Sequence, residues 1–357
     1  MTLPVGTPGT TPEDVPPPGS AVSEKAENAI ELKEVEGLSQ GQIVRRRFFR
    51  HKGALIGLVT IAFVVLLAFS STGFLFVPGW WKYDHETLYD VVNNQHPTLG
   101  LPTWLGGNGF QIGDHPFGQD ELGRDIFART MRGVQTSVQV MVILSAVAAI
   151  LGIVVGAIAG YFRGTVDQVL MRMTDLVLTF PVIVTGAVLG KLVSGRDLWL
   201  SQAVLLAIAL GCIYWTTLAR LVRGEFLTLR EREFVDAAKV AGASSFRIIR
   251  KHMLPNAMGV IIVNTTLLMS AAVLLETALS YLGFGIKGDN VSLGTMISEY
   301  QSAFNTRPWL FWWPGLFIII LALAVNFIGD GLRDAFDPRQ KRIPSARKMA
   351  KAAEATK

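Results

Sequence analysis

Long stretches without a charged residue alternate with short blocks of charge along most of the chain. The charge-free runs occupy 53–81, 133–162, 176–190, 198–219, 253–275 and 308–329. A helix needs about 20 apolar residues to cross the hydrocarbon core of a bilayer. Five runs reach that length, and the short run after Asp175 reaches it if it begins at the apolar turn 169–173. The pattern predicts an all-α integral membrane protein with six transmembrane helices.

The same pattern sets the boundaries of the expected segments. The spans are expected at 54–77, 135–160, 170–194, 199–221, 257–281 and 309–330, the last five within a core domain at 133–331. Around them we expect a disordered tail, an amphipathic lead-in, an extracytoplasmic segment and a cytoplasmic tail, at 1–36, 37–53, 78–132 and 332–357. The tail at 1–36 is rich in Pro, Thr, Gly, Ser and Glu and cannot bury enough apolar surface to fold. It also lacks the charged start and apolar stretch of a signal peptide.

Lysine and arginine gather on one side of such a bundle. With six spans, 23 of them lie beside the spans on the side that holds both ends of the chain, and eight lie on the other side. Cytoplasmic loops of membrane proteins carry this excess. Both termini are therefore expected in the cytoplasm, and an odd number of spans would destroy the asymmetry.

Composition agrees with lipid as the main solvent. The chain is 50% hydrophobic and 17% charged, whereas soluble domains carry about 25% charged residues. The net charge of +5 comes from basic residues that flank apolar runs, so nucleic acid is not an expected partner. Cys212 is the one cysteine, which excludes an intrachain disulfide and a cysteine-based zinc site.

Three glycines in the second span, Gly152, Gly156 and Gly160, are spaced by four residues. This spacing lines one helix face with small residues, so that another helix can approach closely. The alternative is a hinge in the helix. We prefer close packing.

The segment between the fourth and fifth spans, 223–255, carries the most informative pattern. Ala237, Ala238 and Ala241 would give a short helix a small-residue face. Gly242 then permits a left-handed turn, and Ser244 or Ser245 can cap a second amphipathic helix. Small side chains offer little to a bilayer surface, so docking into a protein groove is favoured over an interfacial helix that lies on lipid headgroups.

This segment resembles the EAA loop of ABC-importer permeases, whose pattern is Glu-Ala-Ala, three residues, Gly, nine residues, Ile, one residue, Leu-Pro. Asp236-Ala237-Ala238, Gly242 and Leu254-Pro255 stand at these spacings, with Asp236 in place of Glu and His252 in place of Ile. In that family the loop docks into a cleft of the ATPase subunit. The resemblance therefore implies ATPase-coupling roles for Asp236, Ala237, Ala238, Gly242, Ala243, Phe246, Leu254 and Pro255.

Five further segments resemble the C-type permease of dipeptide and oligopeptide importers: 46–58, 115–125, 160–167, 276–285 and 329–339. The resemblance implies a type I ABC importer permease fold and transport of di- or oligopeptides. Implied partners are a homologous B-type permease, two ATPase subunits or domains, an extracytoplasmic substrate-binding protein and membrane lipid. It implies no catalytic residue, metal or cofactor in this chain, because the ATPase would hold ATP and magnesium. Permeases for nickel look much alike, so nickel import is the alternative.

Segment 115–125 invites a metal-site interpretation, because it contains His115 and several carboxylates. It offers only one histidine, and its glycine and proline spacing suits turns better than ligand geometry. We expect a structural turn at the external face.

Glu276 lies about twenty residues into the fifth span, where an ionisable side chain usually faces protein or water. It could line the translocation pathway and meet a substrate ammonium group. Alternatively, it satisfies a helix end, as the nearby Gly283 and Gly285 suggest. The structural alternative is preferred.

A nucleotide site is not expected in this chain. The nearest approach to a phosphate loop, 186–192, lacks the Ser or Thr after its lysine and lies inside a span. Two other classes remain to be weighed: a self-sufficient ion-coupled transporter and a membrane anchor for a cytosolic complex. The first predicts inverted repeats and buried charges near the midplane, but the spans are nearly uncharged.

Overall fold

The computed structural model describes residues 40–74, 77–100, 104, 109–194, 200–286 and 291–336. The chain divides into two compact units, Met1–Arg47 with Ala335–Lys357, and Phe48–Asp334. Helix α2 (Gln40–Phe48), which belongs to the first unit up to Arg47, begins inside the expected lead-in. The expected tail 1–36 and residues 337–357 of the expected cytoplasmic tail lie outside the described residues.

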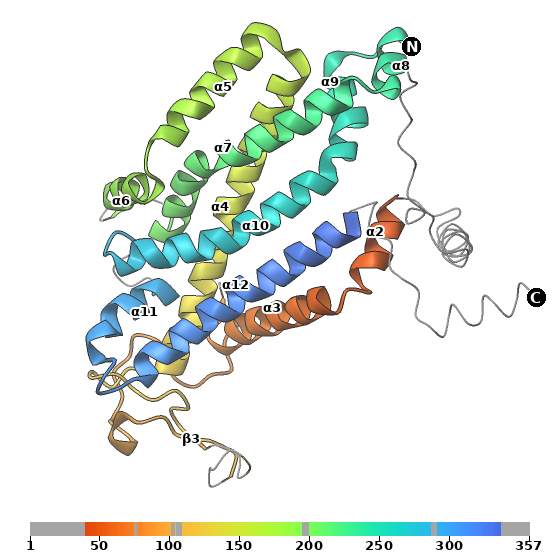
Figure 1. Cartoon of the computed structure of the whole chain (residues 1–357). Coiled ribbons are helices and arrows are strands. Elements are labelled where there is room, and N and C mark those ends of the chain that lie inside the picture. The colour runs from red at the N-terminus through yellow and green to blue at the C-terminus, as the bar shows by residue number, and fades with distance from the viewer. Residues whose placement is uncertain are drawn as a thin grey trace, which may run out of the picture. The chain divides into compact units, whose positions relative to one another are not determined.

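Five described helices are long and apolar enough to cross a bilayer, and a bent pair raises the number to six if it forms one span. The five are α3 (Lys52–Ser71), α4 (Ile126–Phe162), α7 (Gln202–Arg230), α10 (Leu254–Tyr281) with the turns that precede it, and α12 (Trp309–Phe336). The bent pair is α5 (Gly164–Thr179) and α6 (Val182–Val193). Figure 1 shows α3, α7, α10 and α12 running along one another around α4.

The single helix expected at 170–194 is wrong, because the structure has two helices, α5 and α6, in this region. The two helices meet at 83°. Phe180 is extended, with φ −79° and ψ 129°, and Pro181 follows it. Proline has no N–H to donate and disfavours helical geometry in the residue before it. The apolar run is continuous across this break, so the hydrophobic pattern hides it.

Helix α4 begins at Ile126 rather than at the expected residue 135. The Asp125 carboxylate caps it by accepting a hydrogen bond from the Ala128 N–H at 2.8 Å. Two arginines lie in the added turns, and Arg129 donates to Glu299 at 2.6 Å. A charge-free run therefore measures the part of a helix suited to hydrocarbon, not the length of the helix. At about 1.5 Å per residue, the 37 residues of α4 extend about 56 Å.

The short elements lie between the long helices. Two antiparallel strand pairs precede α4: β1 (Gly73–Phe74) with β2 (Val77–Pro78), and β3 (Leu99–Gly100) with β4 (Gln111–Ile112). Between α7 and α10 come α8 (Glu233–Val240), α9 (Ser245–Arg247) and a π-helical turn (Ile248–Met253). Helix α11 (Leu293–Tyr300) lies between α10 and α12, and short 3-10 turns occupy Asn93–Gln95 and Gln301–Ala303.

The buried hydrophobic side chains of the second unit form three clusters. Helix α4 contributes residues to each of them. Its three glycines contact α7: an added Cβ would lie 3.0 Å from the Leu218 Cβ at Gly152, 2.5 Å from the Ala219 carbonyl oxygen at Gly156, and 2.6 Å from the Phe226 Cβ at Gly160. This confirms close packing as the reason for the glycine spacing.

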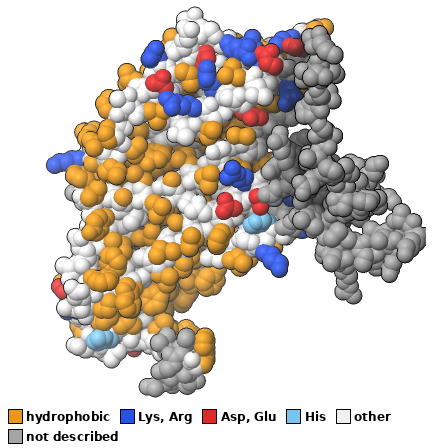
Figure 2. Space-filling view, in the orientation of Figure 1, with side chains coloured by type: hydrophobic (Ala, Val, Ile, Leu, Met, Phe, Trp, Pro, Cys, Tyr) orange, Lys and Arg blue, Asp and Glu red, His pale blue; other side chains and the backbone are white. Residues whose placement is uncertain are grey.

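The visible face of the molecule carries hydrophobic side chains over most of the helical bundle (Figure 2). Lys, Arg, Asp and Glu gather toward the end that carries α8 and α9. Such a broad apolar band suits a hydrocarbon environment.

Candidate functional site

The segment between α7 and α10 folds into a short helix and a tight turn. Gly242 has φ +77°, the left-handed conformation that glycine adopts at low cost. The Gly242 N–H donates to the Lys239 carbonyl at 2.9 Å, and the Ala243 N–H donates to the Ala238 carbonyl at 3.0 Å. These two bonds form a Schellman motif, which ends α8 and reverses the chain.

Apolar side chains anchor this turn to the helical bundle. Val235, Ile248 and Met253 are almost completely buried. They belong to a cluster that also contains Val222 and Phe226 of α7. The base of the turn is therefore packed like a protein core and holds the tip in a fixed position.

Two apolar side chains near Gly242, at the tip of this turn, are largely exposed. Val240 is 91% exposed and Phe246 is 70% exposed. Asp236, in the same helix as Val240, pairs with Lys239 at 2.8 Å. Exposed aromatic and aliphatic side chains on a rigid support are typical of a docking surface.

The chain after Gly242 continues into the predicted membrane span α10 without a break in helical structure. The π-helical turn Ile248–Met253 leads directly into α10, and Pro255 stands in the first turn of that helix. A π-turn shifts the hydrogen-bond register, and proline is tolerated at a helix start because its missing N–H needs no partner there. Residues 245–281 therefore form one continuous helical segment.

Two polar contacts connect the end of α7 to the end of α4 and to Arg163, the residue that follows α4. Arg163 pairs with Glu231 at 2.6 Å, and Arg230 donates to the Tyr161 carbonyl at 2.7 Å. These contacts brace the base of the turn around Gly242 from a second side.

The predicted coupling residues fall into two groups in the structure. Asp236, Ala237, Gly242, Phe246 and Pro255 are exposed, whereas Ala238 is buried and Ala243 and Leu254 are half-buried. Of the three alanines expected on one small-residue face, Ala237 and Ala241 are exposed and Ala238 turns inward, so Ala238 is not available on the outer surface of the turn. Sequence reasoning also missed Val240, an apolar residue whose exposure no local pattern reveals.

Glu276 lies inside the chain, where its carboxylate is fully buried. Ser280 and Ser292 each donate to its Oε1 at 2.7 Å, and Ser137 donates to its Oε2 at 3.1 Å. The three serines come from α10, from the N-cap of α11 and from α4. This placement supports the structural interpretation, and the pathway role stays an untested prediction.

Glu276→Leu is expected to lower the free energy of unfolding by about 3 kcal/mol, because it leaves three buried hydroxyls without their acceptor. Glu276→Gln keeps one acceptor oxygen and is expected to cost less, with uptake per folded molecule unchanged. Thermal unfolding in detergent and uptake in vesicles measure the two effects. Lost uptake at unchanged thermal stability in Glu276→Gln would instead favour the pathway role.

Segment 115–125 forms the joint between the strand-containing segment and α4. The Asp125 carboxylate is fully buried and lies 2.8 Å from the His115 Nδ1. It also accepts from the Trp81 Nε1 at 2.9 Å while it caps α4. Within the described ranges, no three His, Cys, Asp or Glu side chains gather in a way that could hold a metal ion.

A second carboxylate, Asp120, connects the joint to α11. It accepts from the Arg124 Nε at 2.6 Å and from the Tyr300 hydroxyl at 3.0 Å. Burial raises the pKa of Tyr300, so the hydroxyl remains a donor. Arg124 and Arg129 both donate to Glu299 at 2.6 Å. Helix α11 is thus held at both ends, by Glu276 at its start and by this network at its end.

Asp120→Asn is expected to lower the free energy of unfolding by about 1–2 kcal/mol, because the buried contact to Arg124 loses its charge. The readout is the thermal midpoint together with the rate of proteolysis within 114–125. Glu121→Gln is the control, since the Glu121 side chain is 74% exposed. Equal effects of the two changes would contradict the assigned role of Asp120.

Comparison with known families gives two matches that cover most of the chain. Residues 152–342 match the family described as the binding-protein-dependent transport system inner membrane component. Residues 39–97 match the N-terminal transmembrane domain of oligopeptide transport permease C. The first match contains the turn around Gly242, and the second contains α3.

Curated relatives align over nearly the whole chain. The oligopeptide transport system permease protein OppC of Haemophilus influenzae is 34% identical over 319 residues, which cover 89% of this chain and 94% of the relative. The dipeptide transport system permease protein DppC of Bacillus subtilis is 33% identical over 346 residues, 96% of this chain and 100% of the relative. Among solved structures, the inward-facing MetNI methionine ABC transporter aligns with 59% of this chain and 98% of its own, at 19% identity and a TM-score of 0.49. The chain belongs to the family of inner-membrane components of binding-protein-dependent transport systems, in its oligopeptide and dipeptide permease C branch.

Proposed function

We propose that this chain is the C-type permease subunit of an ATP-driven importer of di- or oligopeptides and forms half of the translocation pathway. The names of its OppC and DppC relatives support the peptide substrate. In this proposal the chain has the type I importer fold, the bent pair α5–α6 completes six spans, and both termini lie in the cytoplasm. The excess of Lys and Arg beside the predicted cytoplasmic ends supports this orientation.

The observation that carries the proposal is the rigid turn with the exposed Phe246 at its tip. We assign this turn to the ATPase partner, which would hold ATP and magnesium. Docking would place the partner against Val240 and Phe246. Because residues 245–281 form one helical body, movement of the ATPase would tilt α10 and shift the permease between inward-open and outward-open states.

The proposed complex contains further subunits. A homologous B-type permease would form the other half of the pathway, and an extracytoplasmic binding protein would deliver the substrate. This chain would not hydrolyse ATP itself. Nickel import is the alternative within the same branch, since the binding protein selects the solute. An ion-coupled transporter is the alternative from another class, and the exposed docking turn disfavours it.

Affinity purification of the tagged chain from detergent-solubilised membranes tests the proposal. We expect a second permease and ATPase chains to be recovered, and the reconstituted complex to take up labelled peptide only with ATP and its binding protein. Nickel uptake in place of peptide uptake would support the nickel alternative. Recovery of this chain alone, active in liposomes without ATP, would overturn the proposal.

A further inference from the structure

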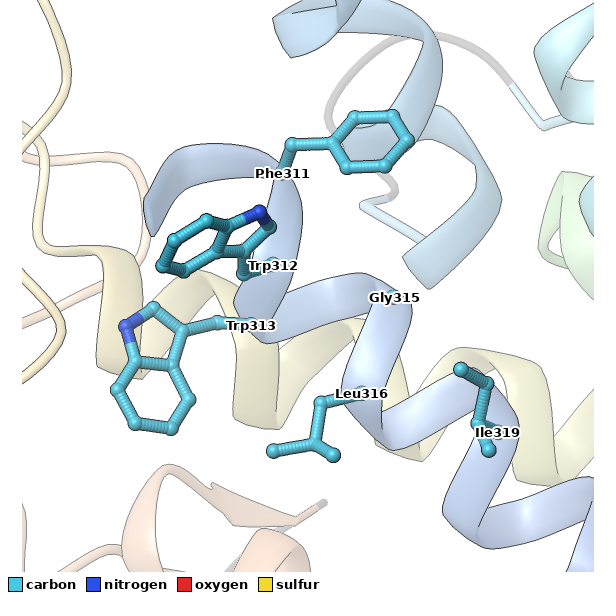
Figure 3. A pocket seen from close by; sticks show the side chains of 6 residues that line it. All are labelled: Phe311, Trp312, Trp313, Gly315, Leu316 and Ile319. Carbon is cyan, nitrogen blue, oxygen red and sulfur yellow. The ribbon is translucent and has the colours of Figure 1, made fainter. Parts of the chain in front are cut away.

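An apolar groove of about 430 Å³ lies along the first three turns of α12. The described residues that line it belong to that helix: Phe311, Trp312, Trp313, Gly315, Leu316 and Ile319. Figure 3 shows the side chains of Trp312, Trp313 and Leu316 projecting from α12, with Ile319 further along the helix and Gly315 presenting no side chain. The described lining residues are apolar or aromatic, and such a lining does not suit a polar solute such as a peptide, because solute sites need a few polar groups for orientation.

The aromatic walls of the groove are held in place by other parts of the chain. Trp313 stacks on Phe117, with ring centroids 3.8 Å apart and planes 8° apart. Phe311 packs edge-on against Phe304, with centroids 5.2 Å apart. The groove is therefore formed before any occupant arrives.

Gly315 has no steric reason to be glycine. An added Cβ there would meet only the Ile297 Cδ1, at an ordinary 3.7 Å, whereas one at Gly57 would lie 2.6 Å from the Ala324 carbonyl oxygen. Glycine inside a helix costs about 1 kcal/mol relative to alanine. What it supplies at position 315 is open space in the groove.

The side chains around the groove indicate which occupant it takes. Trp312, Leu316, Ile319, Leu323 and Phe327 form one exposed stripe along α12, each 43–60% exposed. Helices that pack together in membranes use small residues at the contact, as α4 does with Gly156 against α7. The stripe on α12 instead carries bulky side chains at all five positions, which does not suit close helix packing.

The size and position of the groove fit one leaflet. Residues 311–319 span about 12 Å along the helix, close to half of the roughly 30 Å hydrocarbon core. Tryptophan is enriched where hydrocarbon meets headgroups, and Trp309, Trp312 and Trp313 lie at this end of α12. We propose that the groove at Gly315 is a binding site for one acyl chain of a membrane phospholipid, with Trp312 at its headgroup end.

The test counts the phospholipids retained by the purified complex, by native mass spectrometry in mild detergent. Gly315→Leu fills the groove and is expected to retain one phospholipid fewer per chain. Ala271→Leu, which adds a bulky side chain at an exposed position of α10, is expected to retain the wild-type number. An unchanged count in Gly315→Leu overturns the proposal. Loss of the second permease at an unchanged lipid count also overturns it, and assigns the groove to a partner helix.

A second measurement does not depend on filling the groove. Phospholipid brominated along its acyl chain quenches the fluorescence of a tryptophan that it touches, so the wild type should lose more emission than Trp312→Phe when both are placed in brominated bilayers. Equal losses would contradict acyl contact at Trp312. Both measurements report lipid contact and not transport, so a negative result for lipid would leave the importer proposal unchanged.

Discussion

Gly156→Leu is expected to leave no stably folded chain. A Cβ at this position would lie 2.5 Å from the Ala219 carbonyl oxygen and 2.7 Å from the Val222 Cβ, so α7 would have to move away from α4. Backbone cannot yield as a flexible side chain can. Overpacking typically costs about 1–3 kcal/mol, and displacement of a whole helix should exceed that range. The net stability of a domain is only about 5–15 kcal/mol.

Fluorescence-detected size-exclusion chromatography of the tagged protein measures this effect as loss of the monodisperse peak. Gly224→Leu is the matched control, because it lies on the same helix pair, in α7, and nothing stands within 4 Å of its added Cβ. The control should keep the peak, and the better helix propensity of leucine can add stability. A normal peak for Gly156→Leu would contradict the close helix contact.

The apolar runs predicted where helices cross lipid, because every backbone polar group in hydrocarbon must be satisfied within the helix. They could not predict the 83° bend between α5 and α6. Proline inside a spanning helix can be absorbed as a mild kink or become a full break, and packing decides between the two. The extension of α4 to Ile126 was hidden for a similar reason, since Arg129 finds its partner Glu299 far along the chain.

The turn around Gly242 was partly predictable. Gly242 could be placed in a left-handed turn, because α8 must end there and glycine adopts this conformation at low cost. Which alanine turns inward could not be predicted, since an eight-residue helix is oriented by the core contacts of Val235. The environment of Glu276 could not be predicted either. The three serines that donate hydrogen bonds to its carboxylate are at positions 137, 280 and 292, and two of them are distant in the sequence.

Phe246→Ala is expected to uncouple the importer while leaving the permease folded. The side chain is 70% exposed, so its removal should change the free energy of unfolding by no more than about 0.5 kcal/mol. A buried aromatic anchor at an interface contributes about 2 kcal/mol or more, which corresponds to roughly 30-fold weaker docking of the ATPase. ATP-dependent peptide uptake by the reconstituted complex should fall accordingly, with the recovery of ATPase chains reduced.

Phe110→Ala is the matched control, because Phe110 is 66% exposed and lies next to β4, in the segment before α4. It should retain both uptake and the ATPase. If Phe246→Ala also retains them, the exposed ring does not carry the docking contact, and Val240, which is 91% exposed, becomes the next residue to test. If Phe246→Ala instead lowers the thermal midpoint strongly, the ring packs within this chain. The role of the turn in coupling is supported only when docking is lost and folding is kept.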